Sequence, residues 1–370
     1  MYHKIKRLLT TSVLNSQKRL VAFNLTMNAR REIKHVIRNS KIPKLKPHEV
    51  KEAKSFFKSR GYKLKNTYWH RFFKSATGEF HKDYIPLDIF RPLIEPNLNR
   101  RIYWPALLDK NLTSNLFKEF NQPKTLIKNI NGFYYINDKL ETEALAIETC
   151  NETQSAFIIK PTVDSGKGKM VKKFTMENGE TSIDNLKLID VFKLYKNDFI
   201  VQQVVEQSAK LSALNASTLN TIRVVSYLNK DGGVCILKTY LRIGKPGSDT
   251  DNISIGGIAC AIRDDGFLHP KGYTNRVGGG KVALTETPSG VALNDYQIPN
   301  YSGVIKMVKE MHPIVPLFKI ISWDIGIDIN DMPILIEYNT FYQNLNMQMF
   351  TGPLFGKFAD EILAKGLESY

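Results

Sequence analysis

Apolar and polar residues alternate along two neighbouring stretches near the C-terminus of the chain. Residues 320–339 have the two-residue period and the β-branched content of two strands, with an Asn-Asp pair between them that favours a turn. If the turn is centred on that pair, Asp324 lies directly opposite Glu337, and Asn339 lies on the same face as Glu337. The pattern therefore predicts a hairpin that gathers two carboxylates and an amide.

Two carboxylates this close repel each other unless a cation or a shared proton lies between them. With the amide oxygen of Asn339 they form an all-oxygen set, which suits a hard cation such as Mg²⁺. The alternative is a surface hairpin with two solvated acids. The strand around Glu337 is otherwise apolar, which favours the metal site, with Asp324, Glu337 and Asn339 as ligands.

The rest of the chain mixes helical periods with strand runs. Helices are expected at residues 47–60, 106–120, 141–149, 184–196, 303–312 and 358–367, and a hairpin turns at Asn131-Gly132. An aromatic stretch at residues 68–73 favours the core of a small N-terminal lobe. Its Trp69 and His70 could instead line a substrate site.

A strand run ends in Lys160-Pro and leads into a loop rich in glycine and lysine. Glycines let backbone amides approach a phosphate closely, and hydroxyl and ammonium groups add donors. The candidate phosphate contacts in the loop are Ser165, Gly166, Lys167 and Gly168. The loop is neither a Walker A sequence nor a GxGxxG fingerprint, and ordinary hairpins share its composition.

Basic residues interrupt two β-prone runs in the second half of the chain. Arg223 lies in one run, and alternation places Lys238 and Arg242 on one face of the next. Burying a cation in a central strand is costly unless it meets an anion. Phosphate is a common partner of Arg and Lys, so the three residues are candidate phosphate ligands.

Charge is concentrated at the N-terminus. The chain of 370 residues carries a net charge of +16, and residues 1–74 hold 20 of the 52 Lys and Arg but only three of the 36 acids. Residues 1–40 have a roughly amphipathic helical pattern. The basic segment at residues 1–74 could bind an anionic membrane surface or an acidic glycan, and residues 1–40 could instead pack on the protein with their charges solvated. The absence of a nucleic-acid-binding motif disfavours nucleic acid.

Length, hydropathy and cysteine usage restrict the class further. The chain is long enough for two or three domains, and no apolar run reaches the roughly 20 residues of a transmembrane helix. We find no signal-peptide pattern at the N-terminus. Cys150, Cys235 and Cys260 are widely spaced, which indicates reduced thiols rather than disulfides or a zinc site. We expect a cytoplasmic protein, with peripheral attachment to the inner membrane face as one outcome for the basic segment.

In this order, the pieces resemble the ATP-grasp superfamily, and within it the branch associated with sugar transfer and polysaccharide gene clusters. The resemblance runs from about Tyr84 to the C-terminus. It is carried by Tyr84-Ile-Pro, Ile94-Glu-Pro-Asn-Leu-Asn99, Asp109-Lys-Asn111, Lys160-Pro, the Asp164-Ser-Gly-Lys-Gly168 loop, Asn220-Thr-Ile-Arg223, Leu241-Arg-Ile-Gly244, Asp251-Asn252, Gly256-Gly257, Trp323-Asp324 and Glu337-Tyr-Asn339.

The resemblance implies an ATP-grasp fold, in which two α+β lobes grip ATP between antiparallel sheets. A basic N-terminal helical extension is expected before these lobes. The expected divisions are an extension at residues 1–80, an N-terminal or substrate-side lobe at 81–150, a small lobe with the glycine loop and hinge at 151–206, and a large lobe with the Mg²⁺ site at 207–370.

The resemblance also implies roles for residues around ATP and Mg²⁺. Lys160 would contact the α-phosphate side, and the loop of Ser165, Gly166, Lys167 and Gly168 would cover the β- and γ-phosphates. Gln202, Gln203 and Val205 would form the adenine hinge. Arg223, Lys238 and Arg242 would surround the transferred group, and Asp324, Glu337 and Asn339 would bind the metal. Two features depart from the family pattern: Lys167 separates the glycines, and Gln202-Gln203 stands where a Glu is common.

Three functions remain open at this point. The first is an ATP-dependent carboxylate–amine ligase that forms an amide through an acyl phosphate, attaching an amino acid or similar group to a glycan in cell-surface polysaccharide biosynthesis. The second is a kinase of the same fold that phosphorylates a sugar or lipid-linked hydroxyl. The third is a binding or scaffolding protein with a degenerate site. The sequence does not indicate an oligomeric state.

Overall fold

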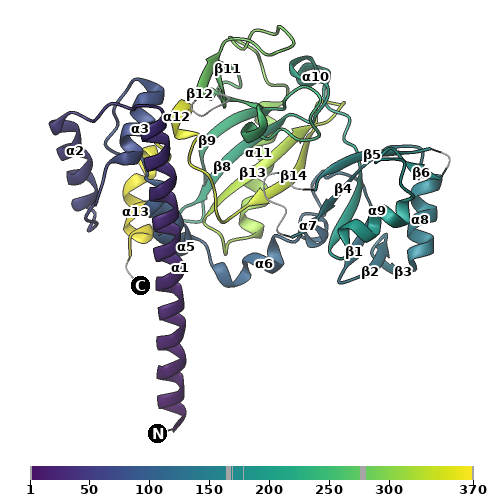
Figure 1. Ribbon diagram of the computed structural model, residues 1–370, viewed down its shortest axis with the longest axis horizontal. Helices are drawn as coiled ribbons and strands as arrows, with labels where there is room; N and C mark the ends of the chain where they lie inside the picture. The colour runs from purple at the N-terminus through teal and green to yellow at the C-terminus, as the bar shows by residue number, and fades with distance from the viewer. Residues whose placement is uncertain (1, 164–167, 169, 178, 276–280, 369–370) are drawn as a thin grey trace.

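The computed structural model describes residues 2–163, 168, 170–177, 179–275 and 281–368, with side chains in these ranges except at residues 2–15, 275 and 281. It contains two antiparallel sheets and a helical layer built from both ends of the chain (Figure 1). The fold class expected from the sequence is confirmed. The two sheets are described in turn, because the candidate site draws residues from both.

The small sheet has the strand order β3-β2-β1-β7-β4-β5-β6. Its strands are β1 (Thr125–Ile130), β2 (Phe133–Ile136), β3 (Lys139–Glu141), β4 (Ala156–Pro161), β5 (Lys172–Glu177), β6 (Glu180–Thr181) and β7 (Phe199–Gln203). Helices α8 (Glu143–Glu152) and α9 (Leu188–Tyr195) pack on it. Alternate strand residues such as Phe157, Ile159 and Phe199 form a buried core with these helices.

One expected division of the chain changes. Residues 125–141 were assigned to a separate lobe at 81–150, but β1 pairs with β7 from Asn129↔Phe199 to Thr125↔Gln202. The small sheet therefore begins at Thr125 rather than after residue 150. The hairpin at Asn131-Gly132 was predicted correctly, since both residues have positive φ between β1 and β2. The pairing of β1 with β7 was not predicted, because strand pairing between distant segments leaves little local trace.

The large sheet has the order β12-β11-β10-β9-β8-β13-β14. Its strands are β8 (Thr221–Leu228), β9 (Val234–Ile243), β10 (Ile258–Ile262), β11 (Leu268–Asn275), β12 (Lys281–Leu284), β13 (Ile320–Ile327) and β14 (Pro333–Asn339). One face packs on α10 (Ala209–Leu214) and α11 (Tyr301–Met311) through buried residues that include Val224, Leu241 and Trp323.

The other face of the large sheet differs between the two ends of its strands: one end is apolar and the other is polar. At one end Val225, Tyr227 and Tyr240 pack on the helical layer. That layer comprises α1 (Tyr2–Asn39), α2 (Pro47–Lys58), α3 (Tyr68–Thr77), α4 (Leu87–Ile89), α5 (Glu95–Leu98), α12 (Gln348–Thr351) and α13 (Ala359–Gly366). Trp69 and His70 are buried in it, as a core role predicts. At the other end the face is polar, and the candidate site lies there.

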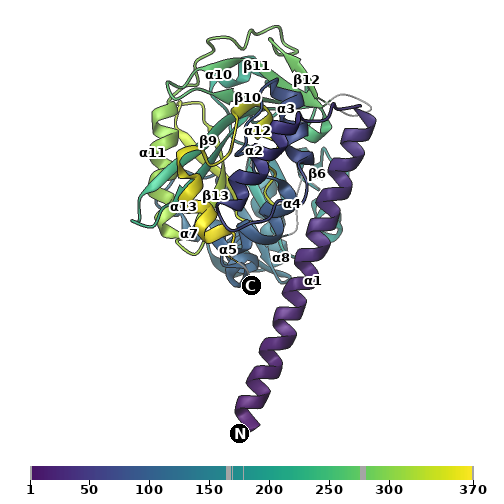
Figure 2. The same ribbon diagram turned by 90° about the vertical axis from the view of Figure 1, so that its left-hand side faces the viewer.

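Helix α1 packs on the body only through its second half. Ala29 and Ile33 are buried in the core, whereas the helix projects from the body toward its N-terminus (Figure 2). In the part of the chain described, we find no helix with the length and apolar content needed to cross a membrane.

The expected helix at residues 106–120 is two helices, α6 (Trp104–Leu107) and α7 (Lys110–Leu116). The break lies at Asp109, whose carboxylate accepts the backbone N–H of Asn111 at 2.9 Å and caps α7. Aspartate is favoured at the N-cap of a helix over the helix interior, so a new helix begins after Asp109. The restart places Lys110 at the first position of α7, where its backbone N–H donates to the Thr162 carbonyl of the small lobe.

Candidate functional site

The predicted hairpin is β13–β14, and its register places Asp324 opposite Glu337. This part of the prediction is confirmed. The turn is longer than the two-residue turn assumed: Asp328 and Met332 close it by a backbone hydrogen bond, and a bulge follows Asp324. The bulge restores the register that the longer turn would otherwise shift.

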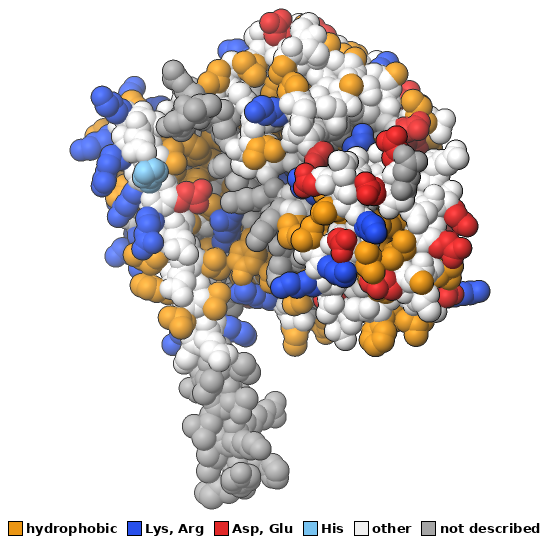
Figure 3. Space-filling model, turned by 45° about the vertical axis from the view of Figure 1, so that its right-hand side comes forward, with side chains coloured by type: hydrophobic (Ala, Val, Ile, Leu, Met, Phe, Trp, Pro, Cys, Tyr) orange, Lys and Arg blue, Asp and Glu red, His pale blue; other side chains and the backbone are white. Residues whose placement is uncertain are grey.

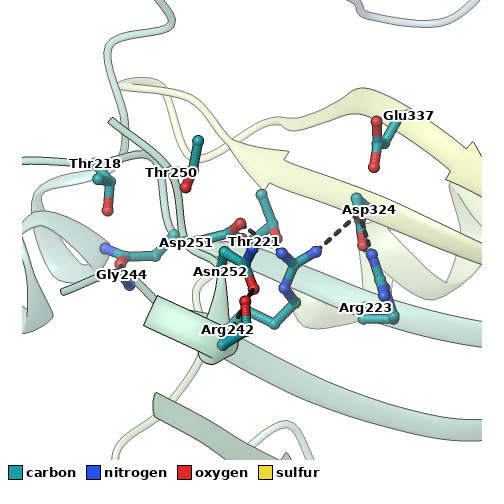
Figure 4. Close-up of polar contacts among 12 residues, drawn as sticks. Thr218, Thr221, Arg223, Arg242, Gly244, Thr250, Asp251, Asn252, Asp324 and Glu337 are labelled. Atoms are coloured by element: carbon teal, nitrogen blue, oxygen red, sulfur yellow. Dashed lines mark hydrogen bonds and ion pairs between the residues drawn. The ribbon is translucent and has the colours of Figure 1, made fainter. Parts of the chain in front are cut away.

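Asp324 is the centre of a buried ion-pair network (Figure 4). It faces Arg223 across the β13–β8 ladder, and its carboxylate accepts Arg223 Nε at 2.6 Å, Arg223 Nη2, and Arg242 Nη1 at 2.9 Å. Its side chain is only 3% exposed. Burial alone would lower the pKa of Arg223, but Asp324 raises it well above the ordinary value, so the guanidinium stays charged.

Asp251 extends the network from the loop after β9. Arg242 Nη2 donates to Asp251 Oδ1 at 2.7 Å, and the Thr221 hydroxyl donates to the other carboxylate oxygen. Burial raises the pKa of Asp251, and the nearby Asp324 adds to the effect, although Arg242 opposes it. Arg242 is thus held between two carboxylates, which fixes its guanidinium at the polar end of the sheet.

Glu337 is the more accessible acid of the hairpin. Its side chain is 35% exposed, and Lys110 Nζ lies 3.6 Å from Oε2. Asn339 Nδ2 donates to Oε1 at 3.3 Å. Burial alone would raise the pKa of Glu337, but Lys110, Arg223, Lys160 and Arg242 together lower it to about 2. Glu337 is therefore an anion at neutral pH, and it projects above Asp324 in Figure 4.

Lys160 brings the small sheet into the site. It lies at the end of β4, opposite Ile200 of β7. Burial and the charge of Lys110 lower its pKa to about 8, while Glu337 acts in the opposite direction. The site therefore combines four cations from both lobes with three carboxylates, a formal excess of positive charge. The residues are Lys110, Lys160, Arg223 and Arg242, with Asp251, Asp324 and Glu337.

The glycine loop is described only at its end. Ser165, Gly166 and Lys167 lie outside the described residues. Gly168 has φ +71°, and a Cβ added there would meet Thr250 Cγ2 at 2.8 Å. Thr250 precedes Asp251, so the end of the loop lies against the large lobe beside the ion-pair network. Only glycine combines this positive φ with so close an approach.

The predicted hinge joins the two lobes. Gln202 donates through its side chain to Thr125 Oγ1 at 3.0 Å, and the backbone N–H of Gln203 donates to Lys124. Both residues are therefore tied into the small sheet, and Val205 lies in the connection that follows β7. Gln207 then fixes the start of the large lobe, because its side chain donates to the carbonyls of Asn215 and Thr218.

Lys238 departs from its predicted place. Its Nζ donates to the Thr351 carbonyl at 2.6 Å, and its contacts are not with Arg223, Arg242 or Asp324. Arg242 is four residues further along β9, roughly 13 Å away. The alternation was correct, since Lys238 and Arg242 share a face, but the helical layer covers one position and not the other. The structure therefore does not bring Lys238 together with Arg223, Arg242 and Asp324.

Two residues of the site were not chosen from the sequence. Lys110 was noted only as part of a long helix and of a family motif, and Asp251 only as part of a family motif. The signal for Lys110 was the Asp-Lys-Asn order, in which an aspartate that caps a helix fixes the next residue at its first turn. Asp251 gives no local signal, because the Arg242 contact depends on how the loop folds back over β9.

The candidate ligands for a cation lie around Glu337. Among the residues described, no group of three or more His, Cys, Asp and Glu is placed to hold a metal ion. Glu337 and Asn339 offer oxygen atoms at the open side of the hairpin, whereas the arginines occupy Asp324. Mg²⁺ is commonly held by one or two carboxylates together with substrate phosphates and waters. Glu337 and Asn339 fit that requirement, and Asp324 would complete it only by releasing an arginine contact.

Comparisons with solved structures give distant likenesses. An L-amino acid ligase from Bacillus licheniformis shares 10% identity with a TM-score of 0.40, over 71% of this chain and 48% of that one. The ATP-grasp ligase PsnB, complexed with precursor peptide PsnA2 and AMPPNP, shares 12% identity with a TM-score of 0.41, over 73% and 63%. The D-alanine–D-alanine ligase from Bacillus anthracis, complexed with ATP, shares 12% with a TM-score of 0.35, over 70% and 64%.

The chain thus spans about half to two thirds of the length of these ligases. No curated protein matches it. The decisive comparison is with protein families, where the sequence model described as sugar-transfer associated ATP-grasp matches residues 91–361. This range includes both sheets and every residue of the candidate site. The chain therefore belongs to the sugar-transfer associated ATP-grasp family.

Proposed function

We propose that the protein is an ATP-dependent carboxylate–amine ligase that binds Mg·ATP between its two sheets. The observation that carries the proposal is the convergence of Lys110 and Lys160 with Arg223 and Arg242 around Glu337. Positive charge drawn from both lobes suits a polyphosphate held between them. The anionic Glu337 within this positive field suits a site in which a cation accompanies the phosphates.

Each group has a proposed task. Lys160 and the glycine loop that ends at Gly168 bind the phosphates, and the connection through Val205 holds the adenine. Arg223 and Arg242 stabilise charge on the transferred group. Mg²⁺, held by Glu337 and Asn339 with Asp324 beside them, would neutralise phosphate charge. Lys110 pairs with Glu337 and would orient it or contact the terminal phosphate.

The proposed chemistry has two steps. A substrate carboxylate attacks the γ-phosphorus of ATP, giving an acyl phosphate and ADP. An amine then attacks the acyl carbon, and phosphate leaves as the amide forms. Phosphoryl transfer depends on positioning and charge stabilisation rather than on a protein nucleophile. The network meets that need with fixed arginines. The chain also has a hydrogen-bonded Ser-His pair, Ser226 and His312. This pair is buried against Trp323 on the opposite side of the sheet from the arginine network.

The family description supports a glycan context, so the proposed substrates are an amino acid or similar molecule and a sugar that carries a carboxylate or an amine. ADP release should be screened for amino acids against uronic acids and amino sugars. Release that requires both a carboxylate and an amine supports the ligase. Mass spectrometry identifies the product: an amide agrees with the proposal, whereas a stable phosphoester would replace it by the kinase.

We propose that the basic segment attaches the enzyme to an anionic membrane surface. Lys and Arg side chains gather over the N-terminal helices (Figure 3). Leu20, Phe23 and Met27 are 62%, 60% and 42% exposed, at a spacing that places them on one side of α1, away from the buried Ala29 and Ile33. An exposed apolar stripe among cations suits an anionic lipid interface.

Deletion of residues 2–26 removes Leu20 and Phe23 of the exposed stripe. It keeps Met27 and the half of α1 that packs on the body. Sedimentation with vesicles that contain an anionic lipid should fall in the deletion protein, and vesicles of neutral lipid are the control. Equal sedimentation of the two proteins would refute the membrane role. Retention on an acidic polysaccharide, lost on the same deletion, would assign the segment to a glycan instead.

A further inference from the structure

A cavity lies at the far end of β9 from the proposed ATP site. Its volume is about 690 Å³. Residues of β9, β10, α11 and the segment before α13 line it. Those used in the argument are Ile236, Lys238, Arg263, Asp264, Ile305, Lys309, Lys357 and Phe358. The volume is that of a small-molecule site rather than of a packing defect.

The cavity opens along an unpaired strand edge. Strand β10 pairs with β9 only from Tyr240 to Ile243, so residues 234–239 have β8 as their one neighbouring strand. In an antiparallel ladder, alternate residues point their N–H and C=O groups away from the partner strand. Backbone donors of β9 therefore face the cavity. Sheet edges of this kind can form anion-binding concavities.

Cations outnumber acids around the cavity. Lys238, Lys309 and Lys357 line it together with one lining carboxylate, Asp264, and the charge of Asp83 also acts on Lys238. The charge of Arg263 is offset by ion pairs with Asp265 at 3.3 Å and Asp295 at 3.1 Å. Lys238 is half-buried, and its ammonium donates to a backbone carbonyl, that of Thr351. A half-buried ammonium in a net positive pocket is stabilised by an anion.

The cavity is separate from the ATP site. Tyr240 lies between Lys238 and Arg242 on the same face of β9, and its ring packs edge-on against Phe350 at 5.3 Å. Phe350 also stacks on Tyr273 at 5.6 Å. These aromatic rings fill the space between the two ends of the strand, so a ligand of the cavity does not reach the arginines.

We propose that this cavity binds a small organic phosphate, a phosphate ester of a sugar or similar alcohol. The three lysines and the β9 edge would hold the phosphate, and the walls formed by Ile236, Ile305 and Phe358 would contact the organic part. The proposal does not depend on the ligase activity, because it uses no residue of the nucleotide site. It gives Lys238 a phosphate partner other than ATP.

Isoleucine methyl groups provide a direct readout, since Ile236, Ile262 and Ile305 line the cavity. Full-length protein with labelled isoleucine methyls is titrated with glucose 1-phosphate, without nucleotide and at constant ionic strength. The three cavity methyls should shift and saturate together. Inorganic phosphate and glucose are separate arms. Glucose 1-phosphate should bind at least tenfold more tightly than either, whereas equal affinity for inorganic phosphate would assign the site to the free ion.

The variants test the lysines. Lys309→Met with Lys357→Met should weaken binding at least tenfold, while Lys306→Met removes the same charge from α11 outside the cavity lining and should leave it unchanged. The unshifted methyls of each spectrum report whether the variant is folded. The proposal is overturned if the three cavity methyls do not respond to either phosphate compound, or if the double variant binds as the wild type does.

Discussion

The two ends of β9 present basic side chains on one face and place them in different surroundings. Arg242 lies between Asp251 and Asp324 and is fixed by the two hydrogen bonds that it donates to their carboxylates. Lys238, on the same face, donates to one backbone carbonyl at the edge of a separate cavity. The same alternation thus yields a rigid ion-pair network at one end and an adaptable ammonium at the other. A strand pattern identifies the face of a cation, and the elements packed over that face decide its role.

The largest expected effect comes from Arg242→Met. The change leaves Asp251 without its arginine and Asp324 with one arginine instead of two, in a buried site. Breaking a buried pair in this way costs about 3–5 kcal/mol in the free energy of unfolding. ATP turnover should fall on the order of 100-fold or more, because the donor that we propose for the transferred group is lost.

The measurements are denaturant unfolding and ADP release. Arg263→Met is the matched control, since its ion pairs with Asp265 and Asp295 are exposed and should contribute little to stability. Similar losses of stability for the two variants would show that the buried network at Arg242 stabilises the protein no more than the exposed ion pairs of Arg263 do.

Next in size is Gly168→Ala. Alanine at φ +71° is strained by about 1 kcal/mol, and its Cβ would meet Thr250 Cγ2. The end of the glycine loop must then move away from the large lobe. We expect the KM for ATP to rise roughly tenfold with little change in stability. Gly179→Ala has a similar positive φ with open space around it and serves as the control; an equal KM change there would contradict the role of the loop.

Proton binding gives a third test. Because the pKa of Lys160 is lowered to about 8, its positive charge is fully present below that pH and is lost as pH rises through it. Affinity for a nucleotide should therefore decline above pH 8, by at most about tenfold per pH unit. Lys160→Met should bind weakly at every pH and lack this decline. A wild-type affinity that is constant from pH 7 to pH 9.5 would remove Lys160 from the phosphate site.

The smallest effect is expected from Lys238→Met, at the other end of β9. The side chain keeps its length and loses its charge, so ATP turnover should stay within about threefold of the wild type and stability should be equal or slightly higher. ADP release and thermal unfolding measure both. A loss of turnover as large as that of Arg242→Met would erase the distinction between the two ends and restore Lys238 to the site of the transferred group.

The sequence predicted the parts of the site that depend on local pattern. The period of two and the turn residues between β13 and β14 predicted Asp324 opposite Glu337, and the register holds because a bulge offsets a turn that is longer than assumed. The alternation of residues along β9 predicted the face of the sheet on which Arg242 lies. The family order of motifs gave the ATP-grasp fold and the place of Lys160 before the glycine loop.

What the sequence did not predict depends on contacts between distant segments. The Arg242–Asp251 pair requires a loop to fold back, and the cover over Lys238 comes from Thr351, more than a hundred residues later. The pairing of β1 with β7 likewise joins segments about seventy residues apart. The break at Asp109 was local, but the apolar period continued across it and concealed the cap that positions Lys110.

The proposed function requires Mg·ATP to bind between the two sheets, beside Glu337. Isothermal titration calorimetry with AMP-PNP, with and without Mg²⁺, tests it most directly on the wild type and on Glu337→Gln, which is similar in shape and lacks the charge. We predict binding to the wild type that strengthens with Mg²⁺ by at least tenfold, and little or no Mg²⁺ effect in Glu337→Gln. No binding of AMP-PNP to the wild type, or the same Mg²⁺ dependence in both proteins, would contradict the account.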